Sequence, residues 1–201
     1  MNKKKVSLIL NVLIVILEII GFIVTYKINS KISYVYYTED SNILALFTCL
    51  IFVCFLLTNK KIPKWLSIMK YISTICLSIT FLVVLFILTP MYGFDFKFMF
   101  FSDALIFQHL LCPILSIITF VMFDDLGSFD KKDSFLGIGL TLLYTFILVI
   151  LNLLDVVYGP YPFLKVKNQT ILMSFIWFIV IIGFSYFISI ALRKIYLKVR
   201  K

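Results

Sequence analysis

The feature that most constrains this chain is a series of six long apolar stretches, which leave room only for short connections. An α-helix needs roughly 20 apolar residues to cross the hydrocarbon core of a bilayer, and each stretch is close to that length. Because water is absent there, the backbone polar groups of each crossing must be satisfied internally, which favours helices. With 62% apolar residues among 201, we predict an all-α polytopic membrane protein with one domain, residues 1–201. The six predicted spans are residues 6–26, 42–58, 66–89, 104–123, 135–155 and 171–192.

Basic residues are distributed unevenly between the connections. Four segments hold 13 Lys and Arg, whereas the three that alternate with them hold only five. By the positive-inside rule, this bias predicts that both termini are cytoplasmic. The basic segments are residues 1–5, 59–65, 124–134 and 193–201, and the others are residues 27–41, 90–103 and 156–170.

The composition also bounds the location and the partners. Seventeen Lys against two Arg indicate AT-rich coding, so we expect a multi-pass protein of the bacterial plasma membrane. The net charge of +9 lies mainly in the cytoplasmic flanks, where it sets orientation and attracts anionic lipid. No basic patch with interleaved aromatic residues points to nucleic acid. We therefore predict a membrane lipid, and no nucleic acid, as the partner.

The first span and the cysteines carry no processing or metal signal. The apolar run after residues 1–5 is too long for a signal peptide and lacks a cleavage site, so we expect it to remain as a span. All four cysteines fall inside predicted spans without CxxC spacing or a His/Cys cluster, which is typical of buried thiols. We predict no metal and no cofactor.

Two residues are candidates for nucleophilic chemistry. His109 is the only histidine, and it lies about 9 Å inside the fourth span, four residues before Pro113. A proline there frees a carbonyl one turn earlier and can kink the helix. Thr38 lies at the outer entry to the second span, and a threonine hydroxyl attacks only when a neighbouring base takes its proton. His109 could be that base, although a simple interhelical hydrogen bond is the alternative.

Several neighbours could orient or bind at the same outer level. Asp155 could hold the His109 ring as the third member of a relay, or it could simply reach the interface at a helix end. Asn42, with Asp40 and Ser41, could cap the second span. A turn at residues 158–163, which contains Tyr158 and Tyr161, cannot continue a helix because it holds two prolines and a glycine.

Glu18 is a different kind of candidate because it lies in the middle of the first span. A carboxyl at that depth is costly and usually faces the bundle interior or a water-filled cavity. It could make a structural hydrogen bond or act in a proton relay.

Three segments together resemble a known group of proteins. The strings YYTEDSNILAL, FQHLLCPILSIITFVMFD and YGPYPFLKV have the order and placement found in predicted six-transmembrane bacterial proteins. That group is similar to the androgen-induced family of integral-membrane hydrolases, which cleave fatty acid esters of hydroxy fatty acids with a threonine and a histidine. The resemblance implies that Thr38 is the nucleophile and His109 the base. It departs from the family at the histidine, which precedes Pro113 by four residues rather than five.

Three functions compete at this point. The first is a lipid-ester hydrolase or acyl transferase in which Thr38 attacks and His109 acts as general base, near the outer leaflet. The second is a small proton-coupled transporter that uses Glu18 and His109 as a relay; the absence of inverted repeats and glycine-broken spans argues against it. The third is a non-catalytic lipid-binding membrane protein.

Overall fold

The computed structural model describes residues 2–200 as an all-helical bundle, without a strand in that range. Six helices are long and apolar enough to cross a membrane, as the sequence predicts. These six helices make the chain a multi-pass membrane protein. Four spans are single helices: α1 (Lys3–Asn29), α2 (Tyr37–Leu57), α7 (Lys131–Leu153) and α8 (Ile171–Val199).

The other two spans combine α-helical and π-helical segments. The third span, Lys64–Met91, consists of α3 (Lys64–Val83), η1 (Val84–Leu88) and α4 (Thr89–Met91). The fourth span, Ile106–Phe123, consists of η2 (Ile106–Leu111), α6 (Cys112–Ile118) and η3 (Thr119–Phe123). Three short helices lie in the connections: α5 (Phe96–Phe101), η4 (Pro162–Leu164) and η5 (Val166–Asn168).

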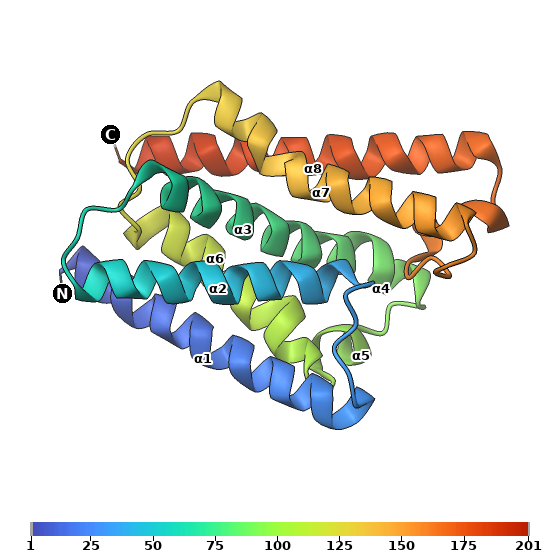
Figure 1. Ribbon diagram of the computed structural model, residues 1–201, viewed down its shortest axis with the longest axis horizontal. Helices are drawn as coiled ribbons and strands as arrows, with labels where there is room; N and C mark the ends of the chain where they lie inside the picture. The colour runs from blue at the N-terminus through green and yellow to red at the C-terminus, as the bar shows by residue number, and fades with distance from the viewer. Residues whose placement is uncertain (1, 201) are drawn as a thin grey trace.

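The bundle has two chemically different ends. Both chain termini lie at one end, together with the α2–α3 and η3–α7 connections (Figure 1). We call this the terminus end, and we call the opposite end the site end. The site end is formed by residues 30–36, 92–105 and 154–170. Placement of both termini at one end follows from an even number of crossings, while the side of the membrane that each end faces remains a prediction from the charge bias.

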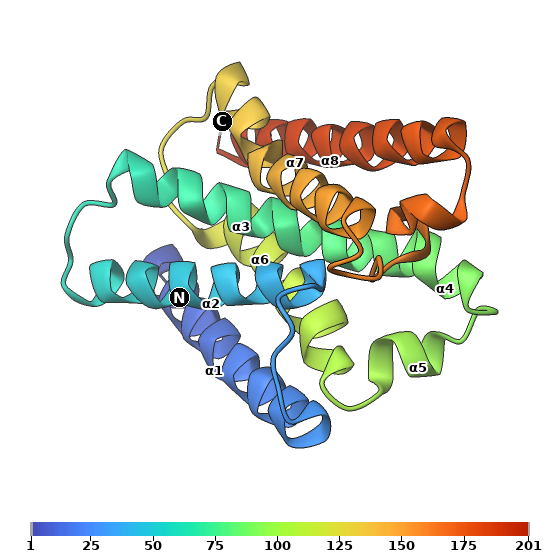
Figure 2. The same ribbon diagram turned by 45° about the vertical axis from the view of Figure 1, so that its right-hand side comes forward.

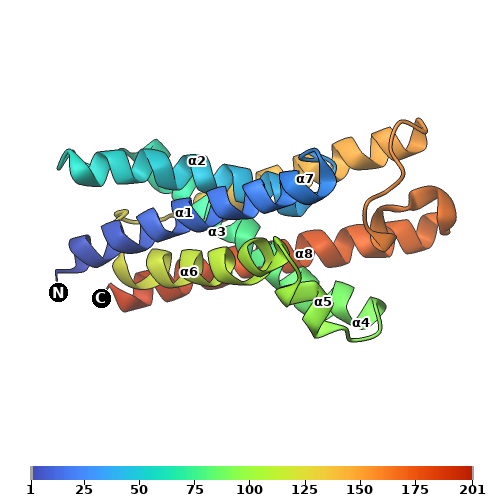
Figure 3. The ribbon, with the colours of Figure 1, turned by 90° about the horizontal axis from the view of Figure 1, so that it is seen from below.

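The third span lies in the middle of the bundle and contacts most of the others (Figures 1 and 2). On one side it packs against α2 and α6, and on the other against α7 and α8. Seen from below, the fourth span lies between α1 and α8 (Figure 3). A helix with neighbours all round is the one expected to bury most of its side chains, and this is so for the third span.

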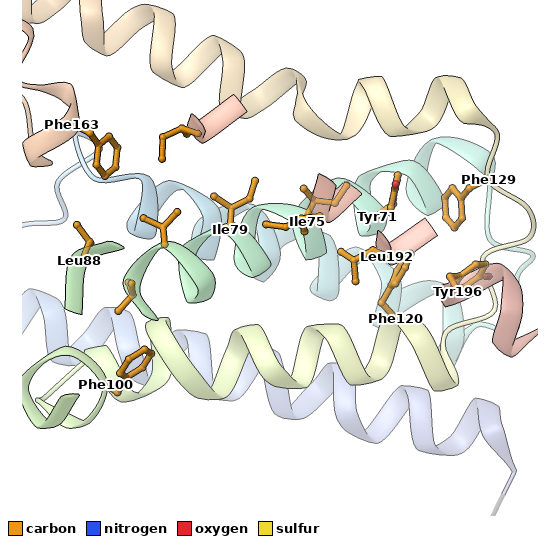
Figure 4. Close-up of a cluster of buried hydrophobic side chains, with 14 of the residues drawn as sticks. Tyr71, Ile75, Ile79, Leu88, Phe100, Phe120, Phe129, Phe163, Leu192 and Tyr196 are labelled. Atoms are coloured by element: carbon orange, nitrogen blue, oxygen red, sulfur yellow. The ribbon is translucent and has the colours of Figure 1, made fainter. Parts of the chain in front are cut away.

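An apolar core runs along the third span from one end of the bundle to the other (Figure 4). At the terminus end it is aromatic, with Tyr71 stacked on Phe120 and Tyr196 packed against Phe129. Ile75 and Ile79 fill the middle, and Leu88, Phe100 and Phe163 close the site end.

The second span begins five residues before its predicted start, at Tyr37. The N-cap is Tyr36, so the prediction that Asp40, Ser41 or Asn42 caps this helix is wrong. The carboxylate of Glu39 instead accepts a hydrogen bond from the backbone N–H of Ser33 in the preceding loop. Polar residues are tolerated in a first turn, where the N–H groups lack helical partners, so hydropathy places this boundary too late. Thr38 consequently lies on the first turn of α2.

The connection at residues 124–134 is only partly the solvated turn that its charges predict. The fifth span begins at Lys131, behind a capping box in which Asp130 and Asp133 each accept a backbone N–H. Asp124 is completely buried, because its carboxylate enters the bundle between α1 and α3.

Candidate functional site

Thr38 and His109 meet at the site end of the bundle. The Thr38 hydroxyl lies 3.3 Å from His109 Nε2, and both side chains are buried. Thr38 comes from the first turn of α2, and His109 comes from the π-helical segment η2. Sequence alone places both residues at one level; the contact requires the two spans to turn their reactive side chains toward each other.

The carbonyl of Met99 determines which His109 nitrogen faces Thr38. His109 Nδ1 lies 2.8 Å from this carbonyl oxygen, which can only accept a hydrogen bond. In the neutral ring Nδ1 therefore carries the proton, and Nε2 presents its lone pair to the Thr38 hydroxyl. Met99 lies on α5, a short helix that the sequence pattern did not identify as part of the site.

The π-helical geometry of η2 sets the direction of His109. The N–H of Cys112 bonds to the carbonyl of Phe107, five residues earlier, just before Pro113 removes the next backbone donor. A π turn of this kind is frequent at functional sites, because the extra residue rotates nearby side chains out of the α-helical register. The kink expected from Pro113 is thus a widened turn that contains His109.

Asn42 links the backbone at Thr38 to the backbone next to His109. Its side-chain amide donates to the Thr38 carbonyl at 2.7 Å and to the Gln108 carbonyl at 3.4 Å. Gln108 is the neighbour of His109 in the chain, so one buried amide links the first turn of α2 to η2. Asn42 holds the backbone of Thr38 and makes no hydrogen bond to its hydroxyl.

Tyr161 is the residue of the 158–163 turn that reaches the site. Its hydroxyl oxygen accepts the backbone N–H of Thr38 at 3.4 Å and also lies beside the Thr38 side chain. The ring is edge-on to Tyr36 and stacked on Phe163, and these contacts hold it against the start of α2. Burial raises the pKa of Tyr161 to about 12, so its hydroxyl remains a donor at neutral pH.

An apolar cavity of about 300 Å³ is lined in part by Thr38. It lies among the third span, α7, α8 and the turn that follows Tyr161. Thr38 lines this cavity and also contacts His109, which is not part of the lining. Its other walls include Ile79, Val83, Leu88, Val149, Phe163, Phe178 and Ile181.

Two of the predicted neighbours lie outside the site. Asp155 does not contact His109: it follows the end of α7 with a positive φ of 60°, and its exposed carboxylate pairs with Lys167. The relay with Asp155 as third member is therefore wrong, and the Met99 carbonyl occupies the position at Nδ1. Tyr158 is also exposed, with Lys165 over its ring and Asn168 near its hydroxyl.

Glu18 is buried in the interior, as its sequence position predicts, but among the described residues it makes no hydrogen bond to Thr38 or His109. It is fully enclosed beside Cys112, and neither carboxyl oxygen has a hydrogen-bond partner among the described residues. No hydrogen bond connects it with His109 in the described chain, so the direct relay between these two residues lacks a contact.

The sequence reasoning missed a charged cluster near the terminus end. Lys70 and Asp124 are fully buried with their charged groups 3.8 Å apart. Lys70 Nζ donates to Asn11 at 2.8 Å and to the Cys49 sulfur at 3.1 Å, while Asp124 accepts from Ser7 at 2.6 Å and from Asn11 at 2.9 Å. A lysine inside an apolar span was the available signal, because a buried charge requires a partner.

Within residues 2–200, no group of three His, Cys, Asp or Glu side chains is arranged to hold a metal ion. Comparisons of the chain with protein-family models, with curated proteins and with solved structures find no match.

Proposed function

We propose that the protein is an integral-membrane lipid-ester hydrolase or acyl transferase with Thr38 as nucleophile and His109 as general base. The observation that carries the proposal is the sequence of contacts from Met99 O through His109 to the Thr38 hydroxyl. Nucleophile, base and a group that orients the base are the parts that activate a hydroxyl in other enzymes. The third part here is a carbonyl rather than a carboxylate.

The proposed reaction has two halves. Thr38 Oγ1 attacks the ester carbonyl carbon while His109 Nε2 takes the hydroxyl proton. The tetrahedral intermediate collapses to an acyl-Thr38 ester, and His109 returns the proton to the departing alcohol. Water or a second alcohol then loses a proton to His109 and attacks the acyl carbon, and Thr38 leaves with that proton. Water gives hydrolysis, and an alcohol gives acyl transfer.

Tyr161 supplies the developing oxyanion with a hydrogen-bond donor in this scheme. Its hydroxyl lies beside Thr38 and lines the same cavity. Because its pKa is raised to about 12, the group enters the reaction protonated. A donor held in place before the reaction stabilises charge that appears only in the transition state.

The cavity favours an acyl chain as the substrate group that lies next to Thr38. Its surface is mainly apolar, although five Thr and Ser side chains are among the lining residues, and no Lys or Arg lines it to bind a phosphate or carboxylate. Several wall residues of α8, including Ile171, Phe175 and Phe178, also have exposed surface, so the cavity borders the face that contacts lipid. A lipid ester could therefore enter sideways from the bilayer. With the predicted orientation in a bacterial plasma membrane, this would be the outer leaflet.

The resemblance to the androgen-induced hydrolases supports the same assignment of Thr38 and His109. The one-residue difference in spacing before Pro113 falls in the π-helical segment, where the angular relation between residues differs from that in an α-helix. The contact between Thr38 and His109 is therefore stronger support for this pairing than the spacing between His109 and Pro113.

Turnover of fluorogenic acyl esters by the purified protein in lipid nanodiscs tests the proposal. We expect turnover and covalent labelling by a hydroxyl-reactive ester probe, and we expect Thr38→Ala to abolish both. Thr119→Ala is the matched control, because Thr119 is a buried threonine whose hydroxyl bonds only within its own helix, far from the site. Absence of turnover in a folded protein, with saturable lipid binding, would favour the lipid-binding alternative. Proton-driven solute flux that Glu18→Gln removes would favour the transporter.

A further inference from the structure

A second, larger cavity lies at the terminus end, on the far side of the bundle from Thr38. It has a volume of about 1370 Å³ and is lined by four separate parts of the chain. These are the start of α1, residues 60–64 between α2 and α3, residues 125–130 before α7, and the end of α8. The proposed esterase chemistry uses none of these segments.

The cavity gathers positive charge. Six cationic side chains line it and only two acidic ones, Asp125 and Asp130, accompany them. Lys64 is partly neutralised by Asp133 at 3.0 Å, but Lys60 and Lys61 have no acidic partner within residues 2–200. The six are Lys3, Lys4, Lys60, Lys61, Lys64 and Arg200.

Part of the cavity wall is apolar, and these residues indicate where the cavity lies relative to the hydrocarbon region. Leu56 and Phe123 lie at the ends of the second and fourth spans, and Ile62, Leu126 and Val199 complete the apolar wall. The cavity therefore begins where the hydrocarbon region ends and opens among the cations of the connections. An amphiphile with an anionic head matches this combination better than a small soluble anion, which would leave the apolar wall uncovered.

One of the cations is already held in place. Arg200 donates to the backbone carbonyl of Asp124, and its guanidinium lies over the Tyr196 ring at 4.3 Å from the centroid. A positioned guanidinium loses less conformational freedom than a free lysine when it binds a phosphate. The same contact ties the cavity to the buried Lys70–Asp124 pair beneath it.

We infer that this cavity binds a phosphate-bearing anion, and that its physiological source is the headgroup of an anionic phospholipid. The need for orientation explains why cations lie at this end, but it does not require them to surround a cavity. Lys131 and Lys132 demonstrate the difference, since they belong to the same end and lie outside the lining. A bound headgroup would contact all four segments and stabilise the folded bundle by mass action.

The test measures binding of phosphatidylglycerol, with phosphatidylcholine as reference, to the full-length protein in detergent micelles. Native mass spectrometry gives the affinity, and the thermal unfolding midpoint gives the stabilisation. The cavity variant is Lys60→Gln/Lys61→Gln, and the control is Lys131→Gln/Lys132→Gln, which removes the same charge from the same end. We expect phosphatidylglycerol to bind selectively, and we expect the cavity variant to weaken it by at least about tenfold, because charge-assisted hydrogen bonds from two lysines to the headgroup are lost. The control should change it by less than about threefold.

Three outcomes would overturn the inference. Equal weakening by both variants would mean that general attraction to the surface accounts for binding. Equal binding of phosphatidylglycerol and phosphatidylcholine would show that the cavity does not recognise the anionic headgroup. Glycerol phosphate that binds as tightly as the lipid would show that free phosphate, and not a lipid, is the source. If the cavity variant does not fold, Lys60→Gln alone against Lys131→Gln alone repeats the comparison with a smaller expected ratio, since the hydrogen bonds of one lysine are lost instead of two.

Discussion

Each end of the bundle holds a buried polar cluster, and the two clusters differ in charge. At the site end, Thr38, His109 and Tyr161 are held by hydrogen bonds among groups that can all be neutral. At the terminus end, Lys70 and Asp124 form a fully buried ion pair with Asn11 and Ser7 around it. A neutral cluster can open toward a ligand without leaving a bare charge, whereas a charged one must stay paired.

The cavities next to these two clusters also differ in charge. The cavity beside Thr38 is small and apolar, while the cavity at the terminus end is large and lined by cations. Reaction of an uncharged ester suits the first, and recognition of an anion suits the second. If the site end carries the chemistry and the terminus end anchors the bundle, substitutions at the two ends should change different properties of the protein.

The largest expected effect is on turnover at the site end. His109→Gln should leave the protein folded and lower lipid-ester turnover by about 10² or more, because the general base is lost. In the double variant with Thr38→Ala the loss should not exceed that of Thr38→Ala alone, since nucleophile and base act as a unit. Initial rates on one acyl ester measure both. Full turnover by His109→Gln would exclude the general-base role.

The next effect is on stability at the terminus end. Lys70→Met should lower the free energy of unfolding by about 3–5 kcal/mol, because it leaves the buried Asp124 carboxylate without its cation. Lys70→Met/Asp124→Asn should recover part of the loss by removing both charges. Unfolding in mixed micelles measures each value. A Lys70→Met protein as stable as the wild type would mean that Asp124 is not held as a buried charge.

A change in rate near the lower limit given for His109→Gln is expected from Tyr161→Phe. Loss of one oxyanion donor should reduce kcat by about 10²-fold with little change in stability, since the ring contacts with Tyr36 and Phe163 remain. A tyrosine donates while protonated, and that state persists below its pKa of about 12. The Tyr161-dependent part of the rate should therefore stay constant from neutral pH to about pH 10. A rise in KM with unchanged kcat would instead indicate a role of Tyr161 in substrate binding.

The smallest effect is expected from Asp155→Asn. Its carboxylate is exposed and pairs with Lys167 at the surface, where such a pair contributes less than about 1 kcal/mol. Both turnover and the unfolding midpoint should stay within error of the wild type. A loss of turnover comparable to that of His109→Gln would restore Asp155 to the site and contradict the role of the Met99 carbonyl.

The six spans and their helical character could be predicted from the sequence alone. These are local properties, because the length and hydropathy of each stretch decide whether it crosses the bilayer. The predicted starts of two spans were wrong, because polar first turns extend these helices back to Tyr37 and Lys131, beyond their apolar residues.

Only the tertiary structure decided which side chains meet. The Thr38–His109 contact depends on how α2 and η2 are rotated about their axes, and the π turn before Pro113 alters that rotation. The burial of Asp124 and the exposure of Asp155 depend on the path of two connections that hydropathy does not describe. Hydropathy measures how favourably a residue enters lipid, and it carries no information about the direction in which a side chain points once the helix is there.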